Sequence, residues 1–293
     1  MSVRRLLPLV LLFLATSAMV AAAPLRIGVV TDIHAHDTNS PTEHKVMTNF
    51  EARLAAFTDA MTAWPADAVL ELGDLVNGAF VMGAPLGDPA RIAGILTNVL
   101  ASLDRFPGPT HFVLGNHDVY DLSKAEFLAA TGAQATAWSL DLGGFHFVAL
   151  DAQFSKAGQD YGHSFWVVPG TVPPAQLAWL KSDLASTALP TIVLVHQPLD
   201  VEFEAEAGGP SVSNRLEVQA ALRDSGRVVA VFQGHSHENR HTITDGIHYV
   251  TFAAMVDSDV PTEPSWAAVM LDSEARTVTV DGFGLQQDLE FGY

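Results

Sequence analysis

Short apolar runs alternate with segments of helical periodicity along most of the chain. A buried strand is predicted where a run of aliphatic residues ends in polar ones, as in LRIGVVT at Leu25–Thr31. A helix is predicted where apolar residues recur every three or four positions, as from Val46 to Met61. The same patterns predict strands at Ala68–Leu72, Thr110–Leu114, Ala137–Leu142, Phe145–Leu150, Thr191–Val195 and Val228–Phe232, and helices at 89–104, Ser123–Ala130, Pro174–Leu184 and Asn214–Ser225.

The region from about 240 to 284 alternates polar and apolar residues, as in TVTVDGF, which is typical of a largely antiparallel closing set of strands. Strand–helix alternation followed by antiparallel strands predicts an α/β fold with mixed β-sheets packed as a sandwich and flanked by helices. No internal repeat or low-complexity linker interrupts the 293-residue chain, so residues 24–293 are predicted to form a single domain. The least regular stretches, 152–173 and 199–213, follow predicted strands, where α/β proteins build binding clefts.

The N-terminus has the pattern of a cleaved signal peptide. Arg4 and Arg5 form a basic region, an apolar stretch follows from Leu6 to about Val20, and small residues occupy 21–23. We therefore expect residues 1–23 to be removed and the protein to be exported, either to the periplasm or as a secreted protein. An uncleaved anchor is the alternative, although the apolar run is short for a membrane span of about 20 residues. No other segment is apolar enough to span a membrane.

Charge and cysteine content narrow the possible partners. The chain carries 15 basic and 33 acidic residues, a net charge of −18, which argues against a nucleic acid polymer because phosphate backbones need a basic surface. A small phosphorylated substrate remains compatible, since bound metal ions can reverse the field inside one cleft. The absence of cysteine excludes disulfides, thiolate ligands and a cysteine nucleophile. The sequence carries no signal for an oligomeric state.

Five short segments combine carboxylate, amide and imidazole side chains, and each directly follows a predicted strand. They are Asp32-x-His34, Gly73-Asp74-x-x-Asn77, Gly115-Asn116-His117-Asp118, His196 and Gly234-His235-x-His237. In one layered core, all five could converge on one rim. Their oxygen and nitrogen donors suit Mn, Fe or Zn. A single segment of this kind is more often structural, whereas five in order favour a site for two metal ions about 3.5–4 Å apart.

In this order the five segments resemble the motifs of the calcineurin-like metallophosphoesterases. The motifs span residues 32 to 237, which is most of the chain. The resemblance implies the four-layer fold of that family. It also implies that one metal ion is bound by Asp32, His34, Asp74 and His237 and the other by Asp74, Asn116, His196 and His235, with Asp74 as the bridge.

The resemblance further implies hydrolysis of a phosphate ester or anhydride by a metal-bridging hydroxide. Asp74 and His117 would be the catalytic residues, with His117 contacting the phosphate and protonating the leaving oxygen. Asn77 stands where purple acid phosphatases have a tyrosine ligand and where protein Ser/Thr phosphatases have an aspartate that orients the catalytic histidine. Two alternatives stay open: a non-catalytic metal-binding module on the same fold, and a phosphomonoesterase rather than a diesterase.

Flanking segments are similar to the manganese-dependent ADP-ribose/CDP-alcohol diphosphatase group, which implies a phosphodiester or nucleoside diphosphate derivative as substrate. These segments are GNHDVYDLSKAEFL at 115–128, FVALDA at 147–152, PAQLAWL at 174–180 and GIHYVTFAAMV at 246–256. That group often has glutamine where this chain has His34. Besides Asn116 and His117, the expected substrate contacts are Tyr120, Tyr161, His163, Phe165 and Trp166. Histidines without a predicted site role are His44, His111, His146, His241 and His248.

Overall fold

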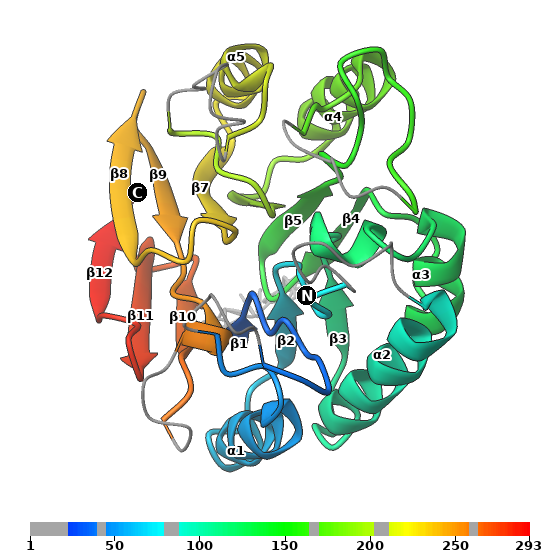
Figure 1. The fold of residues 1–293 in the computed structure, drawn as a ribbon. Coiled ribbons are helices and arrows are strands. Elements are labelled where there is room, and N and C mark those ends of the chain that lie inside the picture. The colour runs from blue at the N-terminus through cyan, green and yellow to red at the C-terminus, as the bar shows by residue number, and fades with distance from the viewer. Residues whose placement is uncertain (1–22, 40–44, 79–87, 164–169, 202–210, 258–262) are drawn as a thin grey trace, which may run out of the picture.

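The computed structural model describes residues 23–39, 45–78, 88–163, 170–201, 211–257 and 263–293. Two six-stranded sheets pack face to face between two layers of helices, as Figure 1 shows. Within the described residues, no helix is both long and apolar enough to cross a membrane. Residues 1–22 of the predicted signal peptide lie outside the described residues, as do His44, Phe165 and Trp166.

The first sheet has the strand order β12-β11-β10-β1-β2-β3. Its members are β1 (Leu25–Val30), β2 (Ala68–Glu71), β3 (Thr110–Phe112), β10 (Trp266–Asp272), β11 (Thr277–Phe283) and β12 (Leu289–Gly292). Strands β1, β2 and β3 run parallel, and β10 to β12 form an antiparallel extension beside β1. Its outer face packs against α1 (Phe50–Ala63), α2 (Pro89–Leu103) and α3 (Lys124–Thr131).

The second sheet has the order β4-β5-β6-β7-β9-β8. Its members are β4 (Trp138–Leu142), β5 (Phe145–Leu150), β6 (Thr191–Val195), β7 (Val228–Gln233), β8 (Arg240–Thr244) and β9 (Ile247–Thr251). The four inner strands are parallel and the two edge strands are antiparallel to their neighbours. Helices α4 (Pro174–Ser186) and α5 (Arg215–Ser225) cover it. Two short 3₁₀ turns, η1 (His117–Val119) and η2 (Met255–Asp257), follow β3 and β9.

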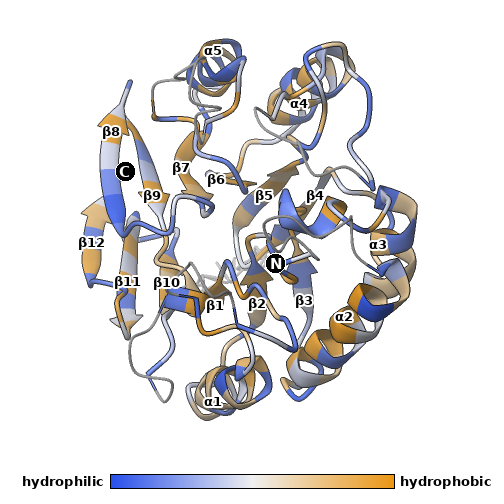
Figure 2. Ribbon diagram, in the orientation of Figure 1, coloured by the Kyte–Doolittle hydropathy of each residue, from blue (hydrophilic) through white to orange (hydrophobic). Residues whose placement is uncertain are grey.

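The inner faces of the two sheets share one apolar core. Ile27 and Val29 of β1 belong to the same buried cluster as Phe145 and Phe147 of β5 and Phe232 of β7. Every residue of β5 and β6 is buried, because one face meets the other sheet and the opposite face meets helices. Figure 2 accordingly shows apolar strands between helices that carry polar outer surfaces. The predicted sandwich of mixed sheets flanked by helices is confirmed.

The C-terminal region differs in one respect from the predicted closing set. Its strands are divided between the two sheets, with β8 and β9 in the second and β10 to β12 in the first. The β8–β9 and β10–β11 pairs are antiparallel as expected, but β9 lies parallel to β7. The reason is the strand order: after β7 the chain forms the edge strand β8, which runs opposite to β7, and then turns back. Strand β9 fills the place between them and so runs parallel to β7.

Candidate metal centre

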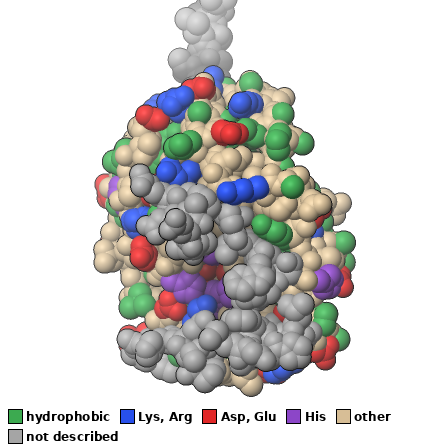
Figure 3. Space-filling model, turned by 45° about the horizontal axis from the view of Figure 1, so that its top comes forward, with side chains coloured by type: hydrophobic (Ala, Val, Ile, Leu, Met, Phe, Trp, Pro, Cys, Tyr) green, Lys and Arg blue, Asp and Glu red, His purple; other side chains and the backbone are tan. Residues whose placement is uncertain are grey.

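The carboxyl ends of five parallel strands, three from the first sheet and two from the second, carry the five predicted segments to one rim. Backbone hydrogen bonds join the loops within each sheet: the Asp32 N–H donates to the Gly73 carbonyl at 3.0 Å, and the Gly234 N–H to the His196 carbonyl at 3.0 Å. The His235 N–H donates to Asp32 Oδ2 at 3.0 Å and so connects the two sheets. Figure 3 shows histidine side chains gathered at one place on this face.

Side chains from these loops form three overlapping groups of candidate metal ligands. In each group the ligand atoms lie within 4.8 Å of one another. The groups are Asp32, His34 and His237; His34, Asp74 and His117; and Asp74, His196 and His235. Asp74 lies in the middle, with Oδ2 3.5 Å from His34 Nε2 and 3.1 Å from His196 Nε2. Asn116 completes the set, since its Oδ1 is 3.1 Å from His196 Nε2.

Four histidines of the rim are oriented in the same way, with Nδ1 held by a protein oxygen. The pairs are His34 with Asn77 Oδ1 at 3.0 Å, His117 with the Asn77 carbonyl at 2.7 Å, His196 with the Leu72 carbonyl at 2.9 Å and His237 with Asp257 Oδ2 at 2.6 Å. Since these oxygens accept, Nδ1 carries the proton and donates. The Nε2 atom of each ring is thereby left as the metal-binding or proton-transferring atom.

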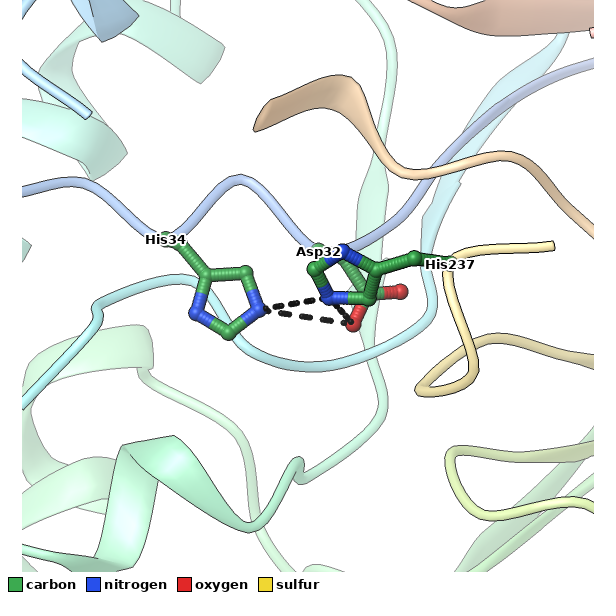
Figure 4. A group of neighbouring side chains, drawn as sticks. All are labelled: Asp32, His34 and His237. Carbon is green, nitrogen blue, oxygen red and sulfur yellow. Dashed lines mark hydrogen bonds and ion pairs between the residues drawn. The ribbon is translucent and has the colours of Figure 1, made fainter. Parts of the chain in front are cut away.

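Asp32 provides a direct test of whether the site fits a cation. Its Oδ2 accepts hydrogen bonds from the Thr31 hydroxyl and the His235 N–H, but its buried Oδ1 has no hydrogen-bond partner within the described structure. Figure 4 shows that Oδ1 faces two imidazole nitrogens, His34 Nε2 at 3.6 Å and His237 Nε2 at 3.3 Å. An oxygen buried in this way needs a compensating positive charge. The donor set is that of a transition metal site, so the residues fit a metal ion.

The two carboxylates of the centre are held in the ionised form. Burial alone would raise the pKa of Asp32, but the facing His237 and His34 hold it well below its usual range. Burial likewise opposes ionisation of Asp74, and His196 and His117 outweigh it and lower the pKa. Ionised carboxylates are the form that binds metal ions.

The histidines of the centre differ in the direction in which their surroundings shift the pKa. Burial would lower the pKa of His196 and His237, but the charge of Asp74 raises the first to about 9 and that of Asp32 raises the second to about 10. Burial and the neighbouring His196 lower the pKa of His235 to about 3. Positive charge on His196 and His237 therefore lies beside Asp74 and Asp32, at the place that a metal ion would take.

The loops of the centre adopt a backbone that most residues avoid. Five of the seven candidate ligands have a positive φ, between 46° and 68°: Asp32, His34, Asp74, His235 and His237. Left-handed backbone at a non-glycine residue costs about 1–3 kcal/mol and is concentrated at functional sites. The neighbouring loops also approach closely, since a Cβ on Gly234 would lie 2.2 Å from Thr31 Oγ1. The ligands are thus held by strained, tightly packed turns.

The predicted substrate contacts lie in different surroundings. Tyr120 is beside the centre: its hydroxyl accepts from Asn116 Nδ2 at 3.0 Å, and its ring centroid is 4.4 Å from that of His117. Tyr161 packs against the core cluster under α1 and α2. His163 pairs with Glu126 at the start of α3, at 2.9 Å. The structure therefore gives Tyr120 an orienting contact with Asn116, whereas Tyr161 contacts the apolar core and His163 contacts Glu126.

Several supporting residues were not predicted from the sequence. Asp118 accepts hydrogen bonds from the N–H groups of Gly115, Asp74 and Val76, at 2.9, 3.0 and 3.3 Å, and so joins the loops after β2 and β3. Burial and the charge of Asp74 raise the pKa of Asp118 to about 7. Asp118 is the last residue of the G-N-H-D segment, so the sequence could have indicated it as part of the site. Asp257 belongs to none of the five segments, so no motif indicated it.

Asn77 also has a role that the sequence did not reveal. Its side chain bonds His34 rather than His117, and His117 is held by its backbone carbonyl. A backbone carbonyl is present whatever the side chain is. The orientation of His117 therefore does not depend on whether residue 77 is asparagine or the aspartate of the protein Ser/Thr phosphatases.

Comparisons with known proteins agree with this geometry. Residues 25–239 match the family model described as Calcineurin-like phosphoesterase. The manganese-dependent ADP-ribose/CDP-alcohol diphosphatase of Xenopus tropicalis is 24% identical over 329 aligned positions, which cover 91% of this chain and 93% of that protein. The corresponding protein of Oryza sativa subsp. japonica is 26% identical over 199 positions, covering 54% of this chain and 61% of its own.

Solved structures show the same fold. A dimetal phosphatase from Danio rerio superposes with a TM-score of 0.77 at 19% identity, covering 92% of this chain and 99% of that one. A purple acid phosphatase from yellow lupin seeds has a TM-score of 0.62 at 13% identity, covering 92% of this chain and 53% of its own. The matched segment, 25–239, contains all seven candidate ligands. The chain therefore belongs to the calcineurin-like phosphoesterase family and is a metal-dependent phosphoester hydrolase.

Proposed function

We propose that this protein uses two metal ions to hydrolyse a phosphate ester or anhydride in a small phosphorylated molecule. The observation that carries the proposal is the convergence of carboxylate and imidazole atoms into three overlapping groups about two ionised carboxylates. One of these, Asp32, has a buried Oδ1 that faces two imidazole Nε2 atoms and has no hydrogen-bond partner within the described structure. One ion would be held by Asp32, His34, Asp74 and His237, and the other by Asp74, Asn116, His196 and His235. We propose manganese, because these donors suit it and the Xenopus tropicalis relative is named as manganese-dependent.

Metal ions bound there would lower the pKa of a water molecule toward neutrality and neutralise charge on the phosphate oxygens. His117 is placed to handle the proton of the leaving group. Its backbone N–H donates to Asp74 Oδ1 at 2.8 Å and so fixes the main chain. Its ring Nδ1 donates to the Asn77 carbonyl, which orients the ring and leaves Nε2 for the substrate. Burial holds the pKa of His117 well below its usual range. Once a bound phosphate favours the protonated ring, His117 is thus a strong proton donor.

We further propose a nucleoside diphosphate derivative as the substrate class. Support comes from the flanking segments and from the names of the curated relatives, which are diphosphatases. The half-buried Lys45 adds to it, because its charge reaches His34 and His117 and, after burial, contributes to lowering the pKa of both. Positive charge near these two histidines favours an anionic substrate in an otherwise acidic protein.

The experiment combines metal analysis with a substrate panel. The purified protein is expected to hold two metal ions per chain and to cleave nucleoside diphosphate derivatives faster than monoesters. Asp74→Asn should lower kcat by about 100-fold or more, because it removes charge shared by both metal positions. Asp141→Asn, at a carboxylate outside the three ligand groups, is the control and should leave kcat unchanged. Full activity of a metal-free protein, or of Asp74→Asn, would refute the proposal, and a preference for monoesters would reassign the substrate.

Export of the protein is also proposed, with residues 24–293 as the mature domain. The N-terminal charge and apolar pattern support it, and β1 begins at Leu25, so removal of residues 1–23 would leave every described strand intact. Intact-mass spectrometry of the protein from the periplasm and medium of a bacterial host should give the mass of a chain shortened at the predicted site. Retention of the full-length mass in the membrane fraction would favour the uncleaved anchor.

A further inference from the structure

Asp257 lies outside all five segments and yet contacts the candidate metal centre. It ends the turn η2, and its Oδ2 is 2.6 Å from Nδ1 of His237. On the opposite side of the same ring, Nε2 of His237 is 3.3 Å from Oδ1 of Asp32, which has no hydrogen-bond partner within the described structure. The imidazole is therefore held between a carboxylate that accepts its Nδ1 proton and the place where a metal ion would bind.

The turn that carries Asp257 is fixed from both sides. The fully buried Arg53 of α1 donates from Nη1 to the carbonyls of Met255 and Val256, at 2.8 and 3.2 Å. In the other direction, the N–H of Val256 donates to the carbonyl of Asp32 at 3.1 Å. Asp257 is thus held in register with Asp32, so the carboxylate and the candidate ligand are parts of one rigid unit.

Asp257 differs chemically from the other groups that hold a rim histidine. His34 is held by an amide oxygen, and His117 and His196 by backbone carbonyls, all of them uncharged. Among these four pairs, only the Nδ1 of His237 is held by a carboxylate. A carboxylate that accepts the Nδ1 proton makes the opposite nitrogen a better electron donor and fixes its tautomer, and removing such a partner commonly weakens metal binding about 10- to 100-fold.

We propose that Asp257, anchored by Arg53, is a positioning residue that strengthens the metal position formed by Asp32, His34 and His237, and does so without affecting the position formed by Asp74, His196 and His235. This inference rests on the two-metal part of the proposed function. The two metal positions then differ in the group that holds Nδ1 of a ligand histidine. In one position the anionic Asp257 holds His237, and in the other the neutral Leu72 carbonyl holds His196.

The test is a titration of the metal-free protein with Mn²⁺. Binding is measured by calorimetry and by the electron paramagnetic resonance signal of the Mn²⁺ that remains free. Wild type is expected to bind two ions. Asp257→Ala should weaken one binding step about 10- to 100-fold and leave the other unchanged. Asp257→Asn keeps an acceptor oxygen without the charge, so it should fall between wild type and Asp257→Ala. It also preserves the test if the alanine variant does not fold.

Asp141→Asn is the matched control, because Asp141 also lies 2.6 Å from a histidine Nδ1, that of His146, at the start of β5 and outside the ligand groups. It should leave both steps unchanged. Asn116→Ala should weaken the step that Asp257→Ala does not. Two-ion binding by wild type with unchanged steps in both Asp257 variants, or equal weakening of both steps, would overturn the role of Asp257. Failure of wild type to bind two ions would instead overturn the proposed function.

Discussion

Gly115 lies against Asp74 with no room for a side chain. A Cβ at this position would be 2.2 Å from both the backbone nitrogen and Oδ1 of Asp74, and no two non-bonded heavy atoms approach that closely. The same Oδ1 accepts the N–H of His117, and Asp118 holds both loops from behind. A methyl group on Gly115 must therefore displace the carboxylate that lies between the two proposed metal positions.

Gly115→Ala is accordingly expected to lower kcat by about 100-fold or more and to reduce the metal content per chain, because the central ligand moves. Gly94→Ala is the matched control: Gly94 lies in α2, and a Cβ there would meet no atom within 4 Å. Replacing this helical glycine should leave activity unchanged and stabilise the fold by about 0.5–1 kcal/mol. Wild-type metal content in Gly115→Ala would show that the loops can relax.

The metal ligands that could be predicted from the sequence are those that lie in short segments of characteristic residue types. Asp32-x-His34 and Gly234-His235-x-His237 were identified because residue type, spacing and position after a strand can all be read from the chain. Asp257 could not be identified, since 20 positions separate it from His237 and its role depends on where η2 lies in space. Asn77 was identified as an unusual residue, but which of its oxygens contacts which histidine is decided by backbone geometry.

His146 connects three elements at the end of the second sheet opposite the rim. Its Nδ1 is 2.6 Å from Asp141 of β4 and its Nε2 is 2.8 Å from Asp183 of α4, while its own backbone is part of β5. Burial opposes protonation, but the two carboxylates outweigh it and raise the pKa of His146. The protonated ring therefore ties β4 and α4 to the centre of the sheet.

The pH dependence of stability follows from the direction of that shift. Because the pKa is higher in the folded than in the unfolded protein, the stabilisation is complete below the unfolded value of about 6.5 and is lost as pH rises through the folded value. His146→Gln should therefore lose more unfolding free energy, relative to wild type, at pH 6 than at pH 9. Urea denaturation of metal-free protein at both pH values measures this, and an equal or larger loss at pH 9 would contradict it.

Element boundaries were predicted well where one residue marks them. Helix α3 starts after Ser123, whose side chain and that of Glu126 cap it reciprocally, and α4 starts at Pro174. Strand β12 was not predicted, because Leu289–Gly292 is a four-residue edge strand with an exposed glutamate and too little alternation to stand out. The division of β8 to β12 between two sheets depends on long-range pairing, which hydropathy does not contain.

The whole molecule is acidic while its proposed substrate is an anion. A net charge of −18 repels a phosphorylated compound at long range, although the metal ions and Lys45 would attract it at the site. Salt screens the long-range repulsion, because the Debye length is about 10 Å at 0.1 M ionic strength. It screens the short contacts inside the centre much less.

Raising the ionic strength from about 0.02 to 0.2 M is therefore expected to increase kcat/KM for a nucleoside diphosphate derivative, by about two-fold or more, at unchanged kcat. Steady-state kinetics in a non-coordinating salt would measure both constants. A fall in kcat/KM with salt would mean that the local positive field extends beyond the rim and dominates the encounter.

The left-handed backbone of five candidate ligands makes the centre a locally strained part of the fold. Without metal, the strain at Asp32, His34, Asp74, His235 and His237 is balanced by the hydrogen bonds and packing of the loops alone. Glycine adopts this backbone freely, whereas an alanine there costs about 1–2 kcal/mol. In the metal-free protein His235→Gly should thus be more stable than His235→Ala, the reverse of the order in helices and strands. Stability and metal binding therefore make opposite demands on these positions, so that a single glycine would increase the first at the expense of the second.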